Sequence, residues 1–193
     1  MKALPWVLIG VRLVFAPVIL VAAFMGWRGS TLFAIAALAM LADLFDGVIA
    51  RKLRLDTERI RQVDSRVDTV FYFAAGIALL YRFPAVWHRY EPWIVALAIV
   101  ELGRMAFEWR KFGRAAAYHM WSAKAWGLAM LLGFGEVTLS GRAGVLFILA
   151  LAVGFVTNLE GLAASILFRQ WHYDVATFWH ALRIERQLRS TQS

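Results

Sequence analysis

Six long apolar segments constrain the fold of this chain more than any other feature of its sequence. They lie near residues 5–25, 31–50, 65–83, 92–109, 121–138 and 143–168. A helix needs about 20 predominantly apolar residues to cross the hydrocarbon core of a bilayer, and each segment reaches or approaches that length. The sequence therefore predicts an all-α, polytopic integral membrane protein with six transmembrane helices.

Composition supports a membrane setting and excludes several kinds of chemistry. Of the 193 residues, 61% are hydrophobic, and the mean hydropathy is +0.62, whereas soluble domains contain about 45–50% apolar residues. The chain has no cysteine, which excludes disulfides and thiolate nucleophiles or ligands. The net charge of +8 on so apolar a chain indicates contact with anionic lipid more than with nucleic acid.

Short connections and the lack of a low-complexity linker favour a single domain over residues 1–193. The first apolar segment begins directly after Met1 and Lys2 and has no small-residue cleavage site, so we interpret it as a retained helix and not as a signal peptide. Residues 170–193 are predicted to form an interfacial C-terminal tail with an amphipathic helix. The simpler alternative is a solvated helix end with aromatic anchors.

Basic residues predict the orientation. With the N-terminus in the cytoplasm, sixteen Lys and Arg residues fall on the cytoplasmic side and four on the other side. Cytoplasmic loops of membrane proteins carry such an excess. We therefore expect a multi-pass protein of the cell (inner) membrane, with a polar cavity among the helices that faces the cytoplasm.

Four carboxylates border the second and third apolar segments. At about 100° per helical residue, Asp43 and Asp46 lie about 60° apart on one helix, and Asp64 and Asp68 lie about 40° apart on the next. If the two helices pack antiparallel across their short connection, all four carboxylates point into one space.

Carboxylates gathered in this way repel one another unless cations neutralise them. Hard oxygen ligands suit Mg²⁺, Mn²⁺ or Ca²⁺, and two such ions close together hold a phosphate or pyrophosphate during an in-line displacement. The alternative is helix-end capping and solvated charge at a membrane border. A charge at the bilayer centre is unfavourable by about 3 kcal/mol, so four facing carboxylates favour the metal site.

The stretch from Asp43 to Asp68 resembles the signature of the CDP-alcohol phosphotransferases (CDP-alcohol phosphatidyltransferases), which are integral membrane enzymes of phospholipid synthesis. That signature places Asp, Asp-Gly and Ala-Arg on one helix, and Gly, Asp and Asp at intervals of four residues on the next. The start of the chain, from Val11 to Pro17, is similar to bacterial phosphatidylglycerophosphate synthases. Seven residues match the signature in identity and spacing: Asp43, Asp46, Gly47, Ala50, Arg51, Asp64 and Asp68.

The resemblance implies transfer of a phosphatidyl group from CDP-diacylglycerol to the hydroxyl of a small polar alcohol, with release of CMP. It implies two divalent cations, Mg²⁺ or Mn²⁺, on the four aspartates, with Asp68 also serving as the general base. Gly47, Ala50 and Arg51 would lie by the nucleotide and its phosphates. Arg51 has an alternative role as a positive-inside anchor. Relatives in the family are often homodimers, so a homodimer is expected.

One position departs from the signature, because Ile60 stands where the family has glycine. The family glycine lets the backbone approach the nucleotide, and a β-branched side chain would crowd that space. We therefore expect either that Ile60 points away from the nucleotide or that the donor binds differently.

Arg104 and Lys124 are candidate contacts for an acceptor phosphate, which favours a polyol phosphate such as glycerol 3-phosphate or inositol phosphate as the acceptor. Helix ion pairs with Glu101 and Glu108 offer a structural alternative for Arg104, and interfacial snorkelling offers one for Lys124. Asn158 and Glu160 are polar residues of the last apolar segment, where pairing with Arg12 or Arg104 would explain them structurally.

Two other functions stay open from sequence alone. In the first, the partners are reversed, so that a soluble CDP-alcohol donates to a lipid hydroxyl. In the second, the chain is a diverged protein that binds metal or lipid without catalysis, which the residue at position 60 favours.

Overall fold

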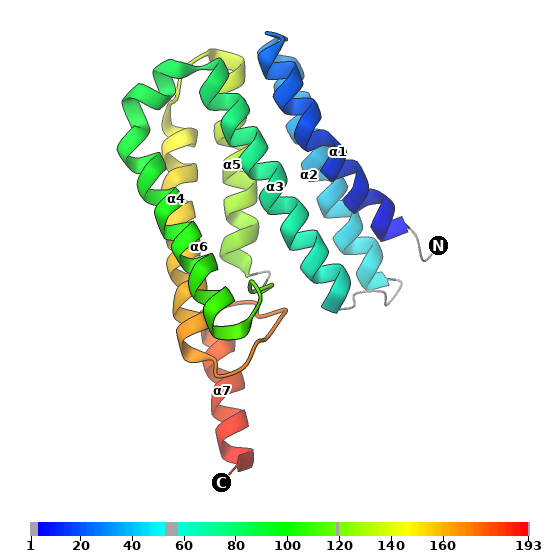
Figure 1. The fold of residues 1–193 in the computed structure, drawn as a ribbon, viewed down its shortest axis with the longest axis vertical. Coiled ribbons are helices and arrows are strands. Elements are labelled where there is room, and N and C mark those ends of the chain that lie inside the picture. The colour runs from blue at the N-terminus through cyan, green and yellow to red at the C-terminus, as the bar shows by residue number, and fades with distance from the viewer. Residues whose placement is uncertain (1–3, 53–57, 119, 193) are drawn as a thin grey trace. The chain divides into compact units, whose positions relative to one another are not determined.

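Seven helices make up the described part of the chain, in which no strand occurs (Figure 1). The computed structural model describes residues 4–52, 58–118 and 120–192, and the side chains of residues 4, 5, 8, 44–52, 58, 59, 61 and 189–192 lie outside that description. The helices are α1 (Leu4–Phe24), α2 (Gly29–Lys52), α3 (Glu58–Arg82), α4 (Pro84–Phe112), α5 (Trp121–Ser140), α6 (Val145–Leu167) and α7 (Phe178–Gln192).

The six apolar segments correspond to helices α1 to α6, which confirms the all-α prediction. The shortest of the six has 20 residues and the longest has 29, so each is about 30 Å long or more. Among the described residues, α6 alone is both long and apolar enough to cross a membrane by length and composition. The apolar stretches Ile9–Phe24 and Gly29–Asp43 are shorter. Six spans therefore stay a prediction.

The chain divides into two compact units. The first comprises Met1–Tyr90 and Leu131–Phe147, and the second comprises Glu91–Met130 and Ile148–Ser193. The division falls inside α4, α5 and α6. Because each unit can be described only by itself, the single domain predicted from sequence stays a prediction.

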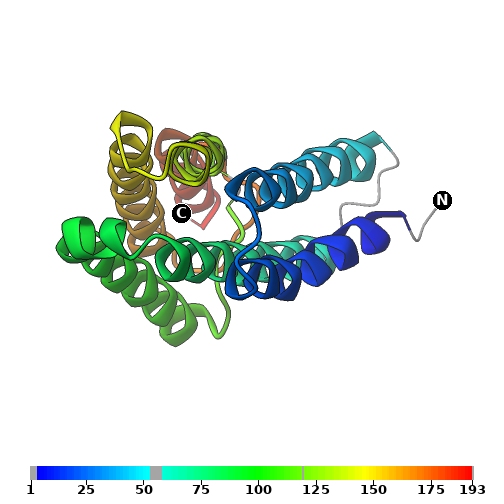
Figure 2. The same cartoon turned by 90° about the horizontal axis from the view of Figure 1, so that it is seen from above.

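In the first unit, α1 packs against both α2 and α3, and the three helices can be followed by their blue to teal colours in Figures 1 and 2. Small side chains let helices approach closely, and several alanines of these helices are buried. They are Ala16, Ala22, Ala23, Ala36, Ala39, Ala74, Ala75 and Ala78. This packing places the middle of α1 against the helices that carry the aspartates.

In the second unit, the connection after α4 pairs with the connection after α6. Ala117 and Tyr173 form an isolated parallel bridge, and the Trp121 amide donates to the Ala176 carbonyl at 3.0 Å. A buried cluster lies around this pairing and includes Phe168 and Ala181. Because Ala181 belongs to α7, this cluster fixes the C-terminal helix to the rest of its unit.

A helix is present in the tail, as predicted, but α7 begins only at Phe178, and its interfacial position stays a prediction. The preceding residues follow the irregular path that pairs with the connection after α4. Asp174 has a φ of 53°, which a helix does not allow. The aromatic residues Trp171 and Tyr173 therefore belong to a non-helical segment, where their rings stack with centroids 5.6 Å apart.

Candidate functional site

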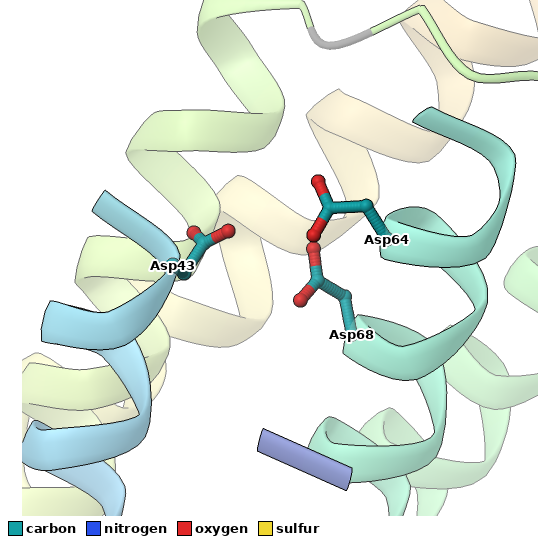
Figure 3. A group of neighbouring side chains, drawn as sticks. All are labelled: Asp43, Asp64 and Asp68. Atoms are coloured by element: carbon teal, nitrogen blue, oxygen red, sulfur yellow. The ribbon is translucent and has the colours of Figure 1, made fainter. Parts of the chain in front are cut away.

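Three of the four predicted aspartates converge in the first unit. Asp43 comes from α2, and Asp64 and Asp68 come from successive turns of α3. One carboxylate oxygen of each lies within 4.8 Å of the others, and Figure 3 shows Asp64 and Asp68 pointing from α3 toward Asp43. The convergence predicted from helical spacing is therefore confirmed for these three side chains.

Sequence reasoning missed the side chain at the centre of this cluster, which is Arg12 of α1. Its Nη1 atom lies 3.1 Å from Asp43 Oδ1 and also pairs with Asp68 Oδ1. Its Nη2 atom donates to Asp64 Oδ1 at 3.1 Å. The signal was present, because an arginine inside an apolar segment needs buried partners, but the sequence does not say which helix supplies them.

The three carboxylates carry more negative charge than Arg12 can offset. Among the described side chains, three carboxylates face one guanidinium, which is a formal excess of about two negative charges, and unbalanced charge is unfavourable where burial reduces its contact with water. The side chain of Asp64 is 11% exposed, while those of Asp43 and Asp68 are 34% and 26% exposed. The oxygen donors, their spacing and this access fit a hard divalent cation.

The remaining signature residues lie in the last turns of α2. The backbone of Asp46, Gly47, Ala50 and Arg51 continues α2, but their side chains lie outside the described residues. Their predicted roles at the metal and the nucleotide stay predictions.

Ile60 packs between α1 and α3. It is 9% exposed and forms a buried cluster with Ile9 of α1 and Val67 of α3. In a helix, residues 60, 64 and 67 share one face, so Ile60 lies one turn before Asp64 on the face of α3 that meets α1. The departure from the family glycine therefore has a packing role.

A second polar cluster lies in the second unit and is centred on Glu108 and Arg104 of α4. Arg104 donates through Nη1 to Glu108 Oε1 at 2.7 Å and through Nε to Asn158 Oδ1 of α6 at 2.9 Å. A Cβ atom on Gly161 would lie 3.3 Å from Arg104 Cδ. The lack of a side chain at Gly161 therefore leaves room for the aliphatic part of Arg104 beside α6. The predicted helix ion pair with Glu108 is confirmed, and so is the pairing of Asn158 with Arg104.

Glu108 is completely buried and has several donors. Besides Arg104, it accepts from the Ala116 amide at 2.9 Å and from Ser165 Oγ at 3.0 Å. Because Ser165 uses its proton on Glu108, the Tyr118 hydroxyl donates to Ser165 Oγ, 2.9 Å away. Burial raises the pKa of Tyr118 to about 12. Tyr118 therefore stays a neutral donor at physiological pH.

The other two polar residues singled out in the sequence have distinct surroundings. Lys124 is exposed on α5, with Nζ 4.5 Å from the centroid of the Trp121 ring, as an interfacial lysine would be. Glu160 accepts a hydrogen bond from the Phe178 amide at 2.9 Å, which satisfies a donor at the first turn of α7. Glu160 thus has a structural partner, while Lys124 stays accessible.

Comparison with known proteins identifies the family. The model of the CDP-alcohol phosphatidyltransferase family matches residues 2–182. Neither the search of curated proteins nor the search of solved structures found a match. The matched region covers nearly the whole chain, including α1, the aspartates of α2 and α3 and the network of α4 and α6. The chain therefore belongs to the CDP-alcohol phosphatidyltransferase family and is a transferase of substituted phosphate groups.

Proposed function

We propose that this protein transfers a phosphatidyl group from CDP-diacylglycerol to the hydroxyl of a small polar alcohol and releases CMP. The family uses CDP-linked donors and alcohol acceptors and is generally dependent on divalent cations. The observation that carries the proposal is the convergence of Asp43, Asp64 and Asp68 within 4.8 Å, because this arrangement suits cations that would hold a pyrophosphate.

The chain's own carboxylates would hold the cations. Asp43, Asp46, Asp64 and Asp68 are the proposed ligands for two Mg²⁺ or Mn²⁺ ions, and three of them are seen to share one site. When bound, such ions neutralise negative charge on the transferring phosphoryl group and on the leaving nucleotide. Gly47, Ala50 and Arg51 follow on α2, and we assign them to the nucleotide.

Asp68 is the proposed general base. A hydroxyl is a poor nucleophile at neutral pH, so a positioned carboxylate that accepts its proton speeds the attack. The alcohol oxygen then forms a bond to the β-phosphorus, the bond from that phosphorus to the CMP oxygen breaks, and CMP leaves with the electron pair. The 26% exposure of the Asp68 side chain gives an acceptor access to it.

Arg104 and Lys124 remain the proposed contacts of a phosphorylated acceptor, such as a polyol phosphate. The side chain of Arg104 is 19% exposed, and Glu108 and Asn158 hold it in one orientation. Lys124 is exposed. A guanidinium held in one orientation and an exposed ammonium are both groups that suit recognition of a phosphate.

We place the protein in the cell membrane as a six-span homodimer with its centre facing the cytoplasm. Only 28% of the apolar window of α6 is buried within the structure, whereas the core helix of a soluble protein would be mostly covered. Apolar side chains are also exposed along other helices, for example Val14 of α1 and Ile99 of α4. The excess of basic residues on one side supports the orientation.

The test is CMP release by purified protein in lipid or detergent, with CDP-diacylglycerol, Mg²⁺ or Mn²⁺ and a panel of alcohols. We expect CMP and a new lipid whose mass identifies the acceptor. EDTA and Asp68→Asn should both abolish release. Asp174→Asn is the matched control, because Asp174 is exposed outside the helices and asparagine tolerates its positive φ.

The same assay distinguishes the alternatives. CMP release only from a soluble CDP-alcohol with diacylglycerol would reverse donor and acceptor. No CMP from either donor with any acceptor, by folded protein that binds Mn²⁺, would mean that the chain binds metal without catalysis.

A further inference from the structure

Arg12 is a buried cation to which the proposed reaction gives no role. Its side chain is 2% exposed, and it reaches Asp43, Asp64 and Asp68 from α1. We propose that Arg12 is a built-in counter-cation that competes with the divalent cation for these carboxylates. It would keep the cluster assembled before loading and set the affinity for the ion. This inference rests on the proposed metal site.

The charge balance explains why the cluster needs such a residue. Three carboxylates with oxygens within 4.8 Å repel one another, most strongly at Asp64, whose side chain is 11% exposed. Arginine stays protonated even when buried, and its planar fork presents several donors at once. A single guanidinium therefore offsets part of the repulsion and ties α1 to α2 and α3.

The geometry explains why Arg12 and an ion compete. Nη1 contacts the Oδ1 atoms of both Asp43 and Asp68, and Nη2 contacts Oδ1 of Asp64. A divalent cation binds carboxylate oxygens at about 2.0–2.6 Å, so an ion shared by these three oxygens needs the space that the guanidinium fills. Loading would therefore require Arg12 to release at least one carboxylate.

A purely structural arginine would behave differently. If Arg12 only held the ligands in place, its removal would weaken cation binding because the cluster would spread. If Arg12 competes, its removal strengthens binding, since the ion no longer displaces a bound cation or meets its repulsion. The two roles predict opposite changes in affinity, and both predict lower stability in EDTA.

The experiment compares purified wild type, Arg12→Gln, Arg12→Lys and Arg104→Gln. Calorimetry gives the Kd for Mn²⁺, and thermal unfolding is followed in EDTA and in rising Mn²⁺. We expect Arg12→Gln to bind Mn²⁺ about tenfold more tightly and to unfold at lower temperature in EDTA. Because bound ligand stabilises the folded state, the difference in Tm should shrink as Mn²⁺ rises. Arg12→Lys should have an intermediate affinity.

Arg104→Gln is the matched control, because it removes a helix arginine paired with a buried carboxylate in the other unit. Its Tm should fall by the same amount with and without Mn²⁺, and its Kd should equal that of wild type. If Arg12→Gln does not fold, the Kd of Arg12→Lys for Mn²⁺ distinguishes competition from a structural role in the same way.

Two outcomes would overturn the inference, and they are distinguishable. Unchanged or weaker Mn²⁺ binding by the Arg12 variants, with normal binding by wild type, would make Arg12 a structural partner only and leave the proposed function intact. If wild type did not bind Mn²⁺, the proposed metal site would be wrong, and so would the proposed competition.

Discussion

The two units each contain a buried arginine cluster, but the clusters differ in their charge balance. In the first unit, Arg12 contacts three carboxylates, so negative charge is in excess among the described side chains. In the second unit, Arg104 pairs with Glu108 and donates to the neutral amide of Asn158, and Glu101 interacts with both Arg104 and Asn158. Glu108 in turn accepts from an amide and a hydroxyl. The second cluster is thus well hydrogen-bonded, while the first has the larger excess of carboxylates among the described side chains.

This difference separates a cluster that attracts cations from one that holds side chains in place. A well hydrogen-bonded network fixes side chains and has little affinity for an external cation. An unbalanced cluster is unfavourable by itself, and nearby divalent ions would relieve it. Substitutions in the first cluster should therefore change cation binding more than stability, and those in the second should change stability more than cation binding.

The largest expected effect is that of Asp64→Asn. It removes a cation ligand, and because metal catalysis supplies several kcal/mol, turnover should fall by about 10²-fold or more. The Tm in EDTA should not fall, because one repelling charge is lost while Arg12 keeps Asp43 and Asp68. Measurements of CMP release and thermal unfolding check both parts. A large decrease in Tm in EDTA would show that the first cluster also stabilises the fold without a bound cation.

Glu108→Ala should act in the opposite way. It leaves Arg104 without its carboxylate and two donors without an acceptor, so the free energy of unfolding should fall by about 3–5 kcal/mol. Denaturant unfolding should give the same loss with and without Mn²⁺. Glu108→Gln is the control, because it retains an acceptor and should lose less of the free energy of unfolding. If Mn²⁺ restored the free energy of unfolding of Glu108→Ala, the two clusters would not differ in this way.

Ile60→Ala tests the packing beside the first cluster. Removal of a buried isoleucine that contacts Ile9 and Val67 should lower the free energy of unfolding by about 2 kcal/mol or more, and Ile60→Val by about 1 kcal/mol. Because the side chain packs on α1, we expect no gain in affinity for CMP in Ile60→Gly. A clear gain would instead show that Ile60 crowds the nucleotide.

The smallest effect concerns His172 in the second unit. Burial lowers the pKa of this histidine, and the negative charge of Glu185 only partly opposes the shift. A base with a lowered pKa in the folded state favours folding at pH above its ordinary value near 6.5, and this contribution is lost as the pH falls below it. The Tm of His172→Phe should therefore fall less than the Tm of wild type between pH 7 and pH 5. An identical pH dependence would argue against the shift.

Much of the helical framework could be predicted from sequence, because long apolar segments predict helices directly. The convergence of Asp43 with Asp64 and Asp68 also followed from local spacing, since both helices flank one short connection. The i, i+4 pair of Arg104 and Glu108 is local in the same sense. These are relations within a helix or between helices that are neighbours in sequence.

The partner of Arg12 could not be predicted in the same way. Helical periodicity gives the face on which a residue lies, but not the helix that this face meets. The contact of Arg12 with α3 spans 52 positions. For Asn158, the sequence left open whether it would pair with Arg12 or with Arg104, and the contact with Arg104 spans 54 positions. The pairing of the connection after α6 with Ala117 is likewise set by tertiary contacts and not by a local motif.

The most direct test of the central claim is a Mn²⁺ titration followed by electron paramagnetic resonance, in which bound Mn²⁺ loses the sharp signal of the free ion. Wild type should bind Mn²⁺ saturably. The double variant Asp64→Asn with Asp68→Asn should lose that binding, and Glu108→Gln should retain it. Equal binding by wild type and the double variant, or no binding by either, would contradict a divalent cation centre built by α2 and α3.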